Sequence, residues 1–180
     1  ATWGEDKAFL AGKHGPANHQ MGKLPEAGKW VRIEVSAKDV GLNPGAQLNG
    51  WLANARDVDG DGRIELFLAA ARDGERRLVC YRQDGAKAWE SPPIGDPLGG
   101  ESGLAIVDLD ADGSFELVFN LSRELWCLDA RTGKTRWKVP LPRSHDNYQV
   151  SVVGHFLDRR QQAVVCRVGA EVSCYDAKGE

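Results

Sequence analysis

Two short acidic loops carry the most distinctive side chains of this 180-residue chain. In each loop three aspartates alternate with other residues, a glycine follows the third aspartate, and a glutamate stands four residues beyond that aspartate. The loops read DVDGDGRIE and DLDADGSFE. Their carboxylate side chains are Asp57, Asp59, Asp61 and Glu65 in the first loop and Asp108, Asp110, Asp112 and Glu116 in the second.

This spacing predicts two calcium ions, one in each loop. Calcium takes about six to eight oxygen ligands, and carboxylates at positions 1, 3 and 5 of a tightly coiled loop point inward together. The backbone carbonyl at position 7, Arg63 or Ser114, offers a further oxygen, and the glutamate at position 9 closes the shell. An EF-hand is excluded because position 12 is Leu68 or Phe119 and strand-like residues follow. The alternative for each loop is a solvated acidic turn without metal.

A repeat organises the rest of the chain. Cys80, Cys127 and Cys174 follow one another at intervals of 47 residues, and Trp89 and Trp137 are 48 residues apart. Short alternating runs between Asp-Gly, Thr-Gly and Lys-Gly turns predict antiparallel strands. We expect them at residues 103–107, 115–121, 124–129 and 134–139 in the second unit and at 149–153, 163–167 and 171–175 in the third.

A period of this size suits a four-stranded propeller blade. The expected fold is therefore all-β: a partial β-propeller of two four-stranded blades and an incomplete third. The domain organisation that we predict is an N-terminal β segment at residues 1–49 and propeller repeats at 50–180, with blades at about 50–92, 103–142 and 149–180. The third unit has His155, Leu157 and Arg159 where the others have aspartates, so no ion is expected there.

Three resemblances support this interpretation. The D-x-D-x-D-G-x-x-E loops resemble those of FG-GAP and VCBS-type propeller repeats. The stretches LWCLDARTGKTRW and VCYRQDGAKAWE resemble the PQQ-like propeller repeat, which implies the fold without a quinone site. Together these two resemblances cover about Gly50 to Glu180. The stretch LPEAGKWVRIEVSAKDVGLNPGAQLNGW resembles the last strands of concanavalin/laminin-G-like jelly-roll modules.

The cysteines and tryptophans favour structural roles. The repeating cysteines are flanked by apolar residues, as buried thiols are. With a turn at Gly169-Ala170, Val165 faces Cys174 and Cys166 faces Ser173, which places the two sulfurs on opposite faces of the hairpin and disfavours a disulfide. Sugar stacking is the alternative to core or blade-interface packing for the tryptophans. They are Trp3, Trp30, Trp51, Trp89, Trp126 and Trp137.

Charge and composition narrow the function. A net charge of −3 gives no electrostatic reason to expect nucleic acid or an anionic membrane as partner. No catalytic, phosphate-binding or zinc motif is visible. We expect a non-catalytic, calcium-binding propeller module of an exported protein, placed outside the cell, on its surface or in the periplasm. Its partners would be a glycan or protein ligand and further blades of a longer parent protein. The alternative is a fragment of a calcium-dependent polysaccharide lyase similar to propeller-type rhamnogalacturonan lyases.

Overall fold

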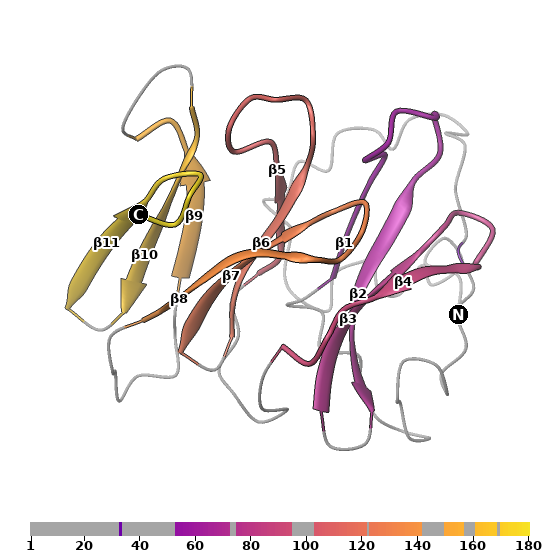
Figure 1. The fold of residues 1–180 in the computed structure, drawn as a ribbon, viewed down its shortest axis with the longest axis horizontal. Helices are drawn as coiled ribbons and strands as arrows, with labels where there is room; N and C mark the ends of the chain where they lie inside the picture. The colour runs from indigo at the N-terminus through magenta and orange to yellow at the C-terminus, as the bar shows by residue number, and fades with distance from the viewer. Residues whose placement is uncertain are drawn as a thin grey trace, which may run out of the picture. The chain divides into compact units, whose positions relative to one another are not determined.

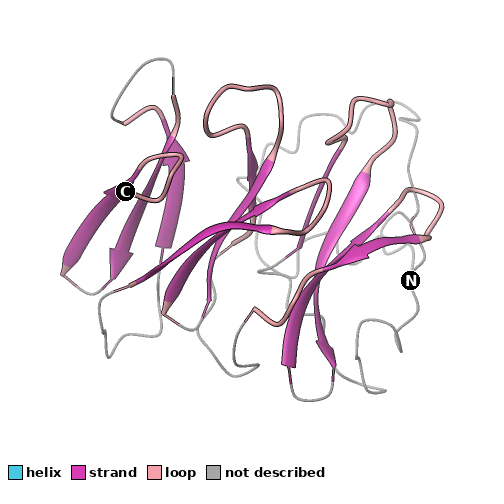
Figure 2. Cartoon of the chain, in the orientation of Figure 1, coloured by secondary structure: helices cyan, strands magenta, loops and turns pink. Residues whose placement is uncertain are grey.

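A computed structural model describes eleven strands of the chain and the loops that join most of them (Figures 1 and 2). The residues it describes are 33, 53–72, 75–94, 103–121, 123–141, 150–156, 161–168 and 170–180. All eleven strands belong to one compact unit, Arg32–Glu180. They form three antiparallel sheets, and no helix occurs among the described residues. The all-β prediction is confirmed, whereas closure into a propeller ring stays a prediction.

The first sheet follows chain order, β1-β2-β3-β4. Its strands are β1 (Ala53–Arg56), β2 (Glu65–Arg72), β3 (Glu75–Tyr81) and β4 (Lys87–Glu90). Strands β2 and β3 stay paired as far as Arg72 and Glu75, the two residues that flank the Asp-Gly pair of the sequence at 73–74. An Asp-Gly pair favours the tight turn of a hairpin.

The second and third sheets repeat this order. The second consists of β5 (Ala105–Val107), β6 (Glu116–Leu121), β7 (Glu124–Asp129) and β8 (Thr135–Pro140). The third consists of β9 (Val150–Gly154), β10 (Ala163–Val168) and β11 (Glu171–Tyr175), and β10 lies in the middle. The boundaries fall within two residues of those predicted from sequence. The register places Val165 opposite Cys174 and Cys166 opposite Ser173, as predicted, and all four cysteines are free.

The second sheet buries both of its faces, because successive side chains of a strand point to opposite sides. Leu117, Phe119 and Leu128 pack in one cluster with Phe67 and Leu78 of the first sheet. The alternate residues Val118, Leu125 and Cys127 pack in another cluster with Val164 and Cys166 of the third sheet. This explains why every residue of β6 is buried, including the polar Glu116 and Asn120.

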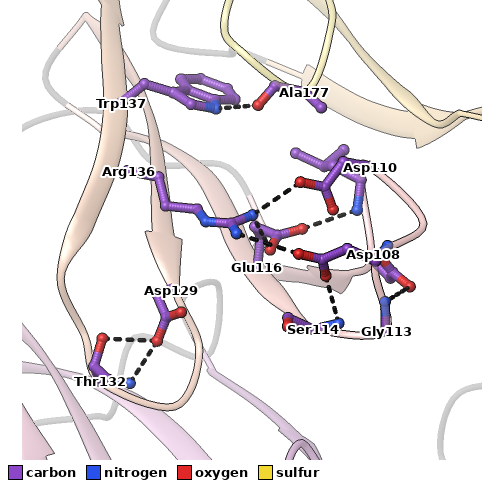
Figure 3. A network of polar contacts seen from close by, with 12 residues as sticks. Asp108, Asp110, Gly113, Ser114, Glu116, Asp129, Thr132, Arg136, Trp137 and Ala177 are labelled. Carbon is purple, nitrogen blue, oxygen red and sulfur yellow. Dashed lines mark hydrogen bonds and ion pairs between the residues drawn. The ribbon is translucent and has the colours of Figure 1, made fainter.

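Two tryptophans join consecutive sheets in the same way. The Trp89 indole N–H of β4 donates to the Ala130 carbonyl in the turn between β7 and β8, at 3.1 Å. The Trp137 indole N–H of β8 donates to the Ala177 carbonyl after β11, at 2.8 Å (Figure 3). Each ring also lies over a glycine of that turn: a Cβ atom at Gly133 would come within 2.4 Å of the Trp89 ring, and one at Gly179 within 2.9 Å of the Trp137 ring.

The predicted packing role of these two tryptophans is therefore confirmed. Trp126 is buried and stacks on Phe119, with ring centroids 6.4 Å apart. The other tryptophans, at positions 3, 30 and 51, lie outside the described residues. So does nearly all of the predicted N-terminal β segment, since only residue 33 is described before 53.

The first two sheets also share a β-bulge between their third and fourth strands. In the first sheet Cys80 pairs with Trp89 and Tyr81 pairs with Lys87, so Ala88 is the extra residue. In the second sheet Cys127 pairs with Trp137 and Leu128 pairs with Thr135, so Arg136 is the extra residue. A bulge redirects the side chain of its extra residue, and the two sheets have very different residues at this point.

Candidate metal centre

The acidic loops occupy equivalent places in the first two sheets. The first loop follows β1 and leads into β2, and the second follows β5 and leads into β6. The glutamate of each loop is the first residue of the strand that follows, Glu65 in β2 and Glu116 in β6. The strand pairing therefore fixes these two carboxylates, while the loops themselves position the aspartates.

The first aspartate of each loop organises the turn. The Asp57 carboxylate accepts hydrogen bonds from the backbone N–H groups of Gly60, at 2.7 Å, and Gly62, at 2.9 Å. The Asp108 carboxylate accepts from Asp112, at 3.1 Å, and Gly113, at 3.0 Å (Figure 3). An aspartate side chain that captures nearby backbone N–H groups stabilises a tight turn in this way.

The glutamates close the loops from the other side. Glu65 Oε2 accepts a hydrogen bond from the Val58 N–H at 3.0 Å, and Glu116 Oε2 accepts one from the Leu109 N–H at 2.9 Å. Both carboxylates are buried, with 8% and 0% of the residue exposed. A buried carboxylate needs a partner for its charge, and one backbone hydrogen bond satisfies only one of its two oxygens.

Three carboxylates converge in each loop, at distances that a shared calcium ion would allow. Carboxylate oxygens of Asp57, Asp59 and Asp61 all lie within 4.8 Å of one another, and so do oxygens of Asp108, Asp110 and Glu116. Two ligands of one calcium ion lie at most about 5 Å apart, since each is about 2.3–2.6 Å from the ion. Neither group contains all four predicted carboxylates of its loop: Glu65 is outside the first group and Asp112 outside the second.

The remaining predicted ligands are placed less directly. The backbone N–H groups of Arg63 and Ser114 donate to Asp61 and Asp112, each at 2.7 Å, so the two loops turn alike at position 7. Their carbonyls stay predicted ligands.

The third unit differs at the equivalent positions. There the His155 ring lies 3.2 Å from the carbonyl of Gln161. Ala163 opens β10 there, where β2 and β6 open with glutamate.

Burial and crowding disfavour the ionised glutamates. Burial is the largest cause that raises the pKa of Glu65, and the nearby Asp59, Asp61 and Asp57 carboxylates raise it further. Burial likewise raises the pKa of Glu116 to about 7, although the Leu109 N–H and Arg136 act in the opposite direction. A bound cation favours the ionised form of a carboxylate, so a metal ion would relieve this unfavourable electrostatics in both loops.

One functional residue was missed by the sequence reasoning. Arg136, the extra residue of the β8 bulge, directs its guanidinium into the second loop (Figure 3). Its nitrogens lie 3.5 Å from Asp110 and 3.7 Å from Asp112, and it forms an ion pair with Glu116. The available signal was its position directly before Trp137, where the first unit has Ala88.

The first loop has a different neighbour. Arg131, from the turn between β7 and β8, donates to the backbone carbonyls of Val58 at 3.2 Å and Asp59 at 3.4 Å, and so leaves the carboxylates untouched. A cavity of about 200 Å³ lies beside the loop. Its lining includes Asp59, Asp61, Glu65, Ala88, Trp89 and Arg131.

Comparison with known proteins supports part of the sequence interpretation. The model of the FG-GAP-like repeat family matches residues 57–119, a segment that contains both acidic loops. No curated protein matches the chain. Among solved structures, the chain is similar to the V. cholerae biofilm matrix protein Bap1, with 15% identity and a TM-score of 0.37. The match covers 72% of this chain and 27% of that one, so the chain spans about a quarter of that protein.

The FG-GAP part of the predicted resemblance is thus supported, while the VCBS, PQQ-like and jelly-roll resemblances stay predictions. In the part of the chain that the structure describes, no helix combines the length and hydropathy that a membrane crossing needs.

Proposed function

We propose that this chain is a calcium-binding β-repeat module of an exported protein, in which calcium stabilises the loops of a propeller that binds a glycan or protein ligand or serves as a scaffold. The observation that carries the proposal is the pair of equivalent acidic loops, each with three converging carboxylates, within the segment that matches the FG-GAP-like repeat.

Calcium fits the donor set of these loops. The converging side-chain donors are all carboxylate oxygens, which are the hard ligands that calcium prefers. Without a cation the first loop brings four acidic groups together, and the pKa of Glu65 rises in response to burial and to the three aspartates. Extracellular modules use weak sites of about 10⁻⁴ to 10⁻³ M affinity, so calcium outside the cell would suffice to fill them.

The repeated junctions between sheets support the propeller. Trp89 and Trp137 contact the following sheet through the same pair of interactions, a hydrogen bond to an alanine carbonyl and a ring placed over a glycine. The same two contacts therefore join the first sheet to the second and the second to the third. Further blades of a parent protein would pack against the third sheet in the same way, where Val152, Phe156 and Val172 are exposed.

Calorimetry on the chelated protein tests calcium binding. We expect about two sites per chain, with Asp59→Ala and Asp110→Ala each removing one. Asp158→Ala, in the third unit, is the matched control and should remove none. A titration that shows no binding would refute the proposal and make both loops plain acidic turns.

Thermal unfolding gives an independent test. A ligand that binds only the native state stabilises it by about 2.7 kcal/mol at a hundredfold excess over Kd. Addition of a chelator should therefore lower the melting temperature by several degrees, and the double variant Asp59→Ala/Asp110→Ala should lose this response.

A glycan array tests the ligand-binding role. We expect the chain to be retained on the array without cleaving any glycan, whereas cleavage of pectic polysaccharide would identify a lyase instead.

A further inference from the structure

We propose that Arg136 is a built-in counterion that makes the two calcium sites unequal: the first loop binds calcium more tightly than the second, which binds it only when the ion displaces the guanidinium. This inference rests on the proposed calcium binding and goes beyond it, because it assigns an affinity-determining residue that carries none of the metal-ligating oxygens.

The backbone places Arg136 for this role. As the extra residue of the bulge, it departs from the regular alternation of β8, and its side chain reaches Glu116 at the start of β6. The Arg136 side chain is 31% exposed and Glu116 is fully buried, so the guanidinium covers the carboxylate from the solvent side. Bulges are used in this way to redirect a side chain toward a site.

The contacts of Arg136 coincide with the predicted metal ligands. Its guanidinium lies near Asp110 and Asp112 and pairs with Glu116. Two of these residues, Asp110 and Glu116, belong to the converging group. Calcium at this point must break the ion pairs and would stand close to a like charge. Breaking charge-assisted hydrogen bonds of this kind corresponds to a calcium affinity about 10- to 150-fold lower.

The first loop has no such counterion. Ala88 occupies the equivalent position of the bulge and cannot reach the loop. Within the described ranges, no lysine or arginine pairs with a carboxylate of the first loop. Ala88 and Glu65 instead line the cavity of about 200 Å³. The space that Arg136 fills beside Glu116 is therefore open beside Glu65. Arg82 and Arg131 also line this cavity, but none of the ion pairs among the described residues joins either of them to Glu65.

The two loops can be measured separately. Asp110→Ala disables the second loop and reports the calcium affinity of the first, and Asp59→Ala does the reverse. We expect the first loop to bind calcium at least about 10-fold more tightly. Adding Arg136→Ala to the Asp59→Ala variant should then tighten the second loop by about 10-fold or more. Arg136→Lys keeps the charge without the planar fork and should fall between wild type and Arg136→Ala.

The reciprocal substitution keeps the test decisive if Arg136→Ala folds poorly. Ala88→Arg introduces the counterion beside the first loop, where the cavity can accept it, and should weaken calcium binding there by about 10-fold or more. Circular dichroism in chelator checks the folding of each variant. Ala86→Arg, at the residue directly before β4 and outside the bulge, controls for the added charge and should leave the calcium affinity within about twofold of wild type.

The outcomes separate this inference from the proposed function. Two sites of equal affinity that neither Arg136→Ala nor Ala88→Arg changes would overturn the role of Arg136 and leave calcium binding intact. Absence of calcium binding in the wild type and in every variant would refute the proposed function, and this inference with it. Unequal sites whose order reverses in the double variant Arg136→Ala/Ala88→Arg would establish the proposal.

Discussion

The first and second sheets share their backbone design and differ in the charge beside the acidic loop. Both have four strands in the same order, a bulge at the same place and a glutamate that opens the second strand. The extra residue of the bulge is Ala88 in one sheet and Arg136 in the other. The comparison shows that a repeat can keep its fold while one residue changes the electrostatics of a loop about 20 residues away in sequence.

The third sheet extends the same series. Ala163 replaces the glutamate and His155 replaces the first aspartate, so both ends of the third loop have lost their carboxylates. The three units thus differ in a graded way. In the first, no described lysine or arginine pairs with the loop carboxylates; in the second, Arg136 does; in the third, the acidic ligands are missing at these two positions. Substitutions at the sheet junctions, at the two glutamates and at the fourth loop position test whether the first two units are as alike in scaffold, and as different in charge, as the structure indicates.

The largest expected effect concerns the junctions between sheets. Gly133→Ala would bring a Cβ within 2.4 Å of the Trp89 ring at a backbone φ of 69°, which an alanine adopts only with strain. We expect a loss of about 3 kcal/mol in the free energy of unfolding, measured in urea. Gly179→Ala meets Trp137 at 2.9 Å and should cost about 1–2 kcal/mol.

Gly113→Ala is the matched control for these junctions. It has a similar φ of 85°, but a Cβ there would meet no atom within 4 Å. It should cost only the strain of the backbone, about 1 kcal/mol. A Gly133→Ala variant no less stable than Gly113→Ala would mean that the Trp89 ring can move aside, and that the junction tolerates more than its geometry suggests.

The second prediction compares how much each loop glutamate contributes to the free energy of unfolding when a chelator removes calcium. Glu116→Ala leaves Arg136 without its buried partner and the Leu109 N–H without an acceptor, and should lower the free energy of unfolding by about 2–3 kcal/mol. Glu65→Ala also removes an acceptor from a buried N–H, that of Val58, but it relieves repulsion with three aspartates. Its cost should be about 1 kcal/mol.

An exposed pair provides the reference for this comparison. Lys138 and Glu124 lie 3.0 Å apart, with half of the lysine side chain exposed, and exposed ion pairs of this kind contribute at most about 1 kcal/mol. Glu124→Ala should therefore change stability less than Glu116→Ala does. If Glu116→Ala and Glu65→Ala lowered the free energy of unfolding equally, the Arg136 guanidinium would be as stable in contact with water as in its ion pair with Glu116.

The smallest expected effect lies at the fourth position of the loops. Ala111 has a φ of 59° and Gly60 a φ of 78°, so both loops need a left-handed residue there. Ala111→Gly should stabilise the second loop by about 0.5–1 kcal/mol, since glycine adopts this conformation without strain. Gly60→Ala should destabilise the first loop by a similar amount. If both variants matched wild type in urea unfolding, the loops would be able to avoid the left-handed conformation.

The sequence was sufficient for much of the scaffold because its turns are explicit. The strand at 124–129 and the one at 171–175 were placed at their observed residues, since short turns delimit them on both sides. The same reasoning predicted the pairing of Val165 with Cys174. The acidic loops were recognisable because in each of them three alternating aspartates are followed by a glycine, Gly62 or Gly113, whose φ is positive in the structure.

Arg136 shows where sequence reasoning reached its limit. Strict alternation along a strand assigns each residue to a face, but the bulge between Cys127 and Leu128 breaks this alternation. A bulge depends on how two strands pair, and no single residue type marks it. The sequence also could not show which carboxylates of a loop converge. Glu65 and Glu116 stand at the same distance in sequence from their aspartates, but only Glu116 belongs to the converging group of its loop.

The tryptophan junctions also bear on how the chain reaches this structure as it is made. Trp89 finds its acceptor 41 residues further along the chain, and Trp137 finds its acceptor 40 residues further along. Chains are synthesised from the N-terminus, and units that contact only their neighbours assemble one after another. Each of the first two sheets can therefore be fixed against the next one as soon as the turn that carries the acceptor has been synthesised, without contacts from any distant part of the protein.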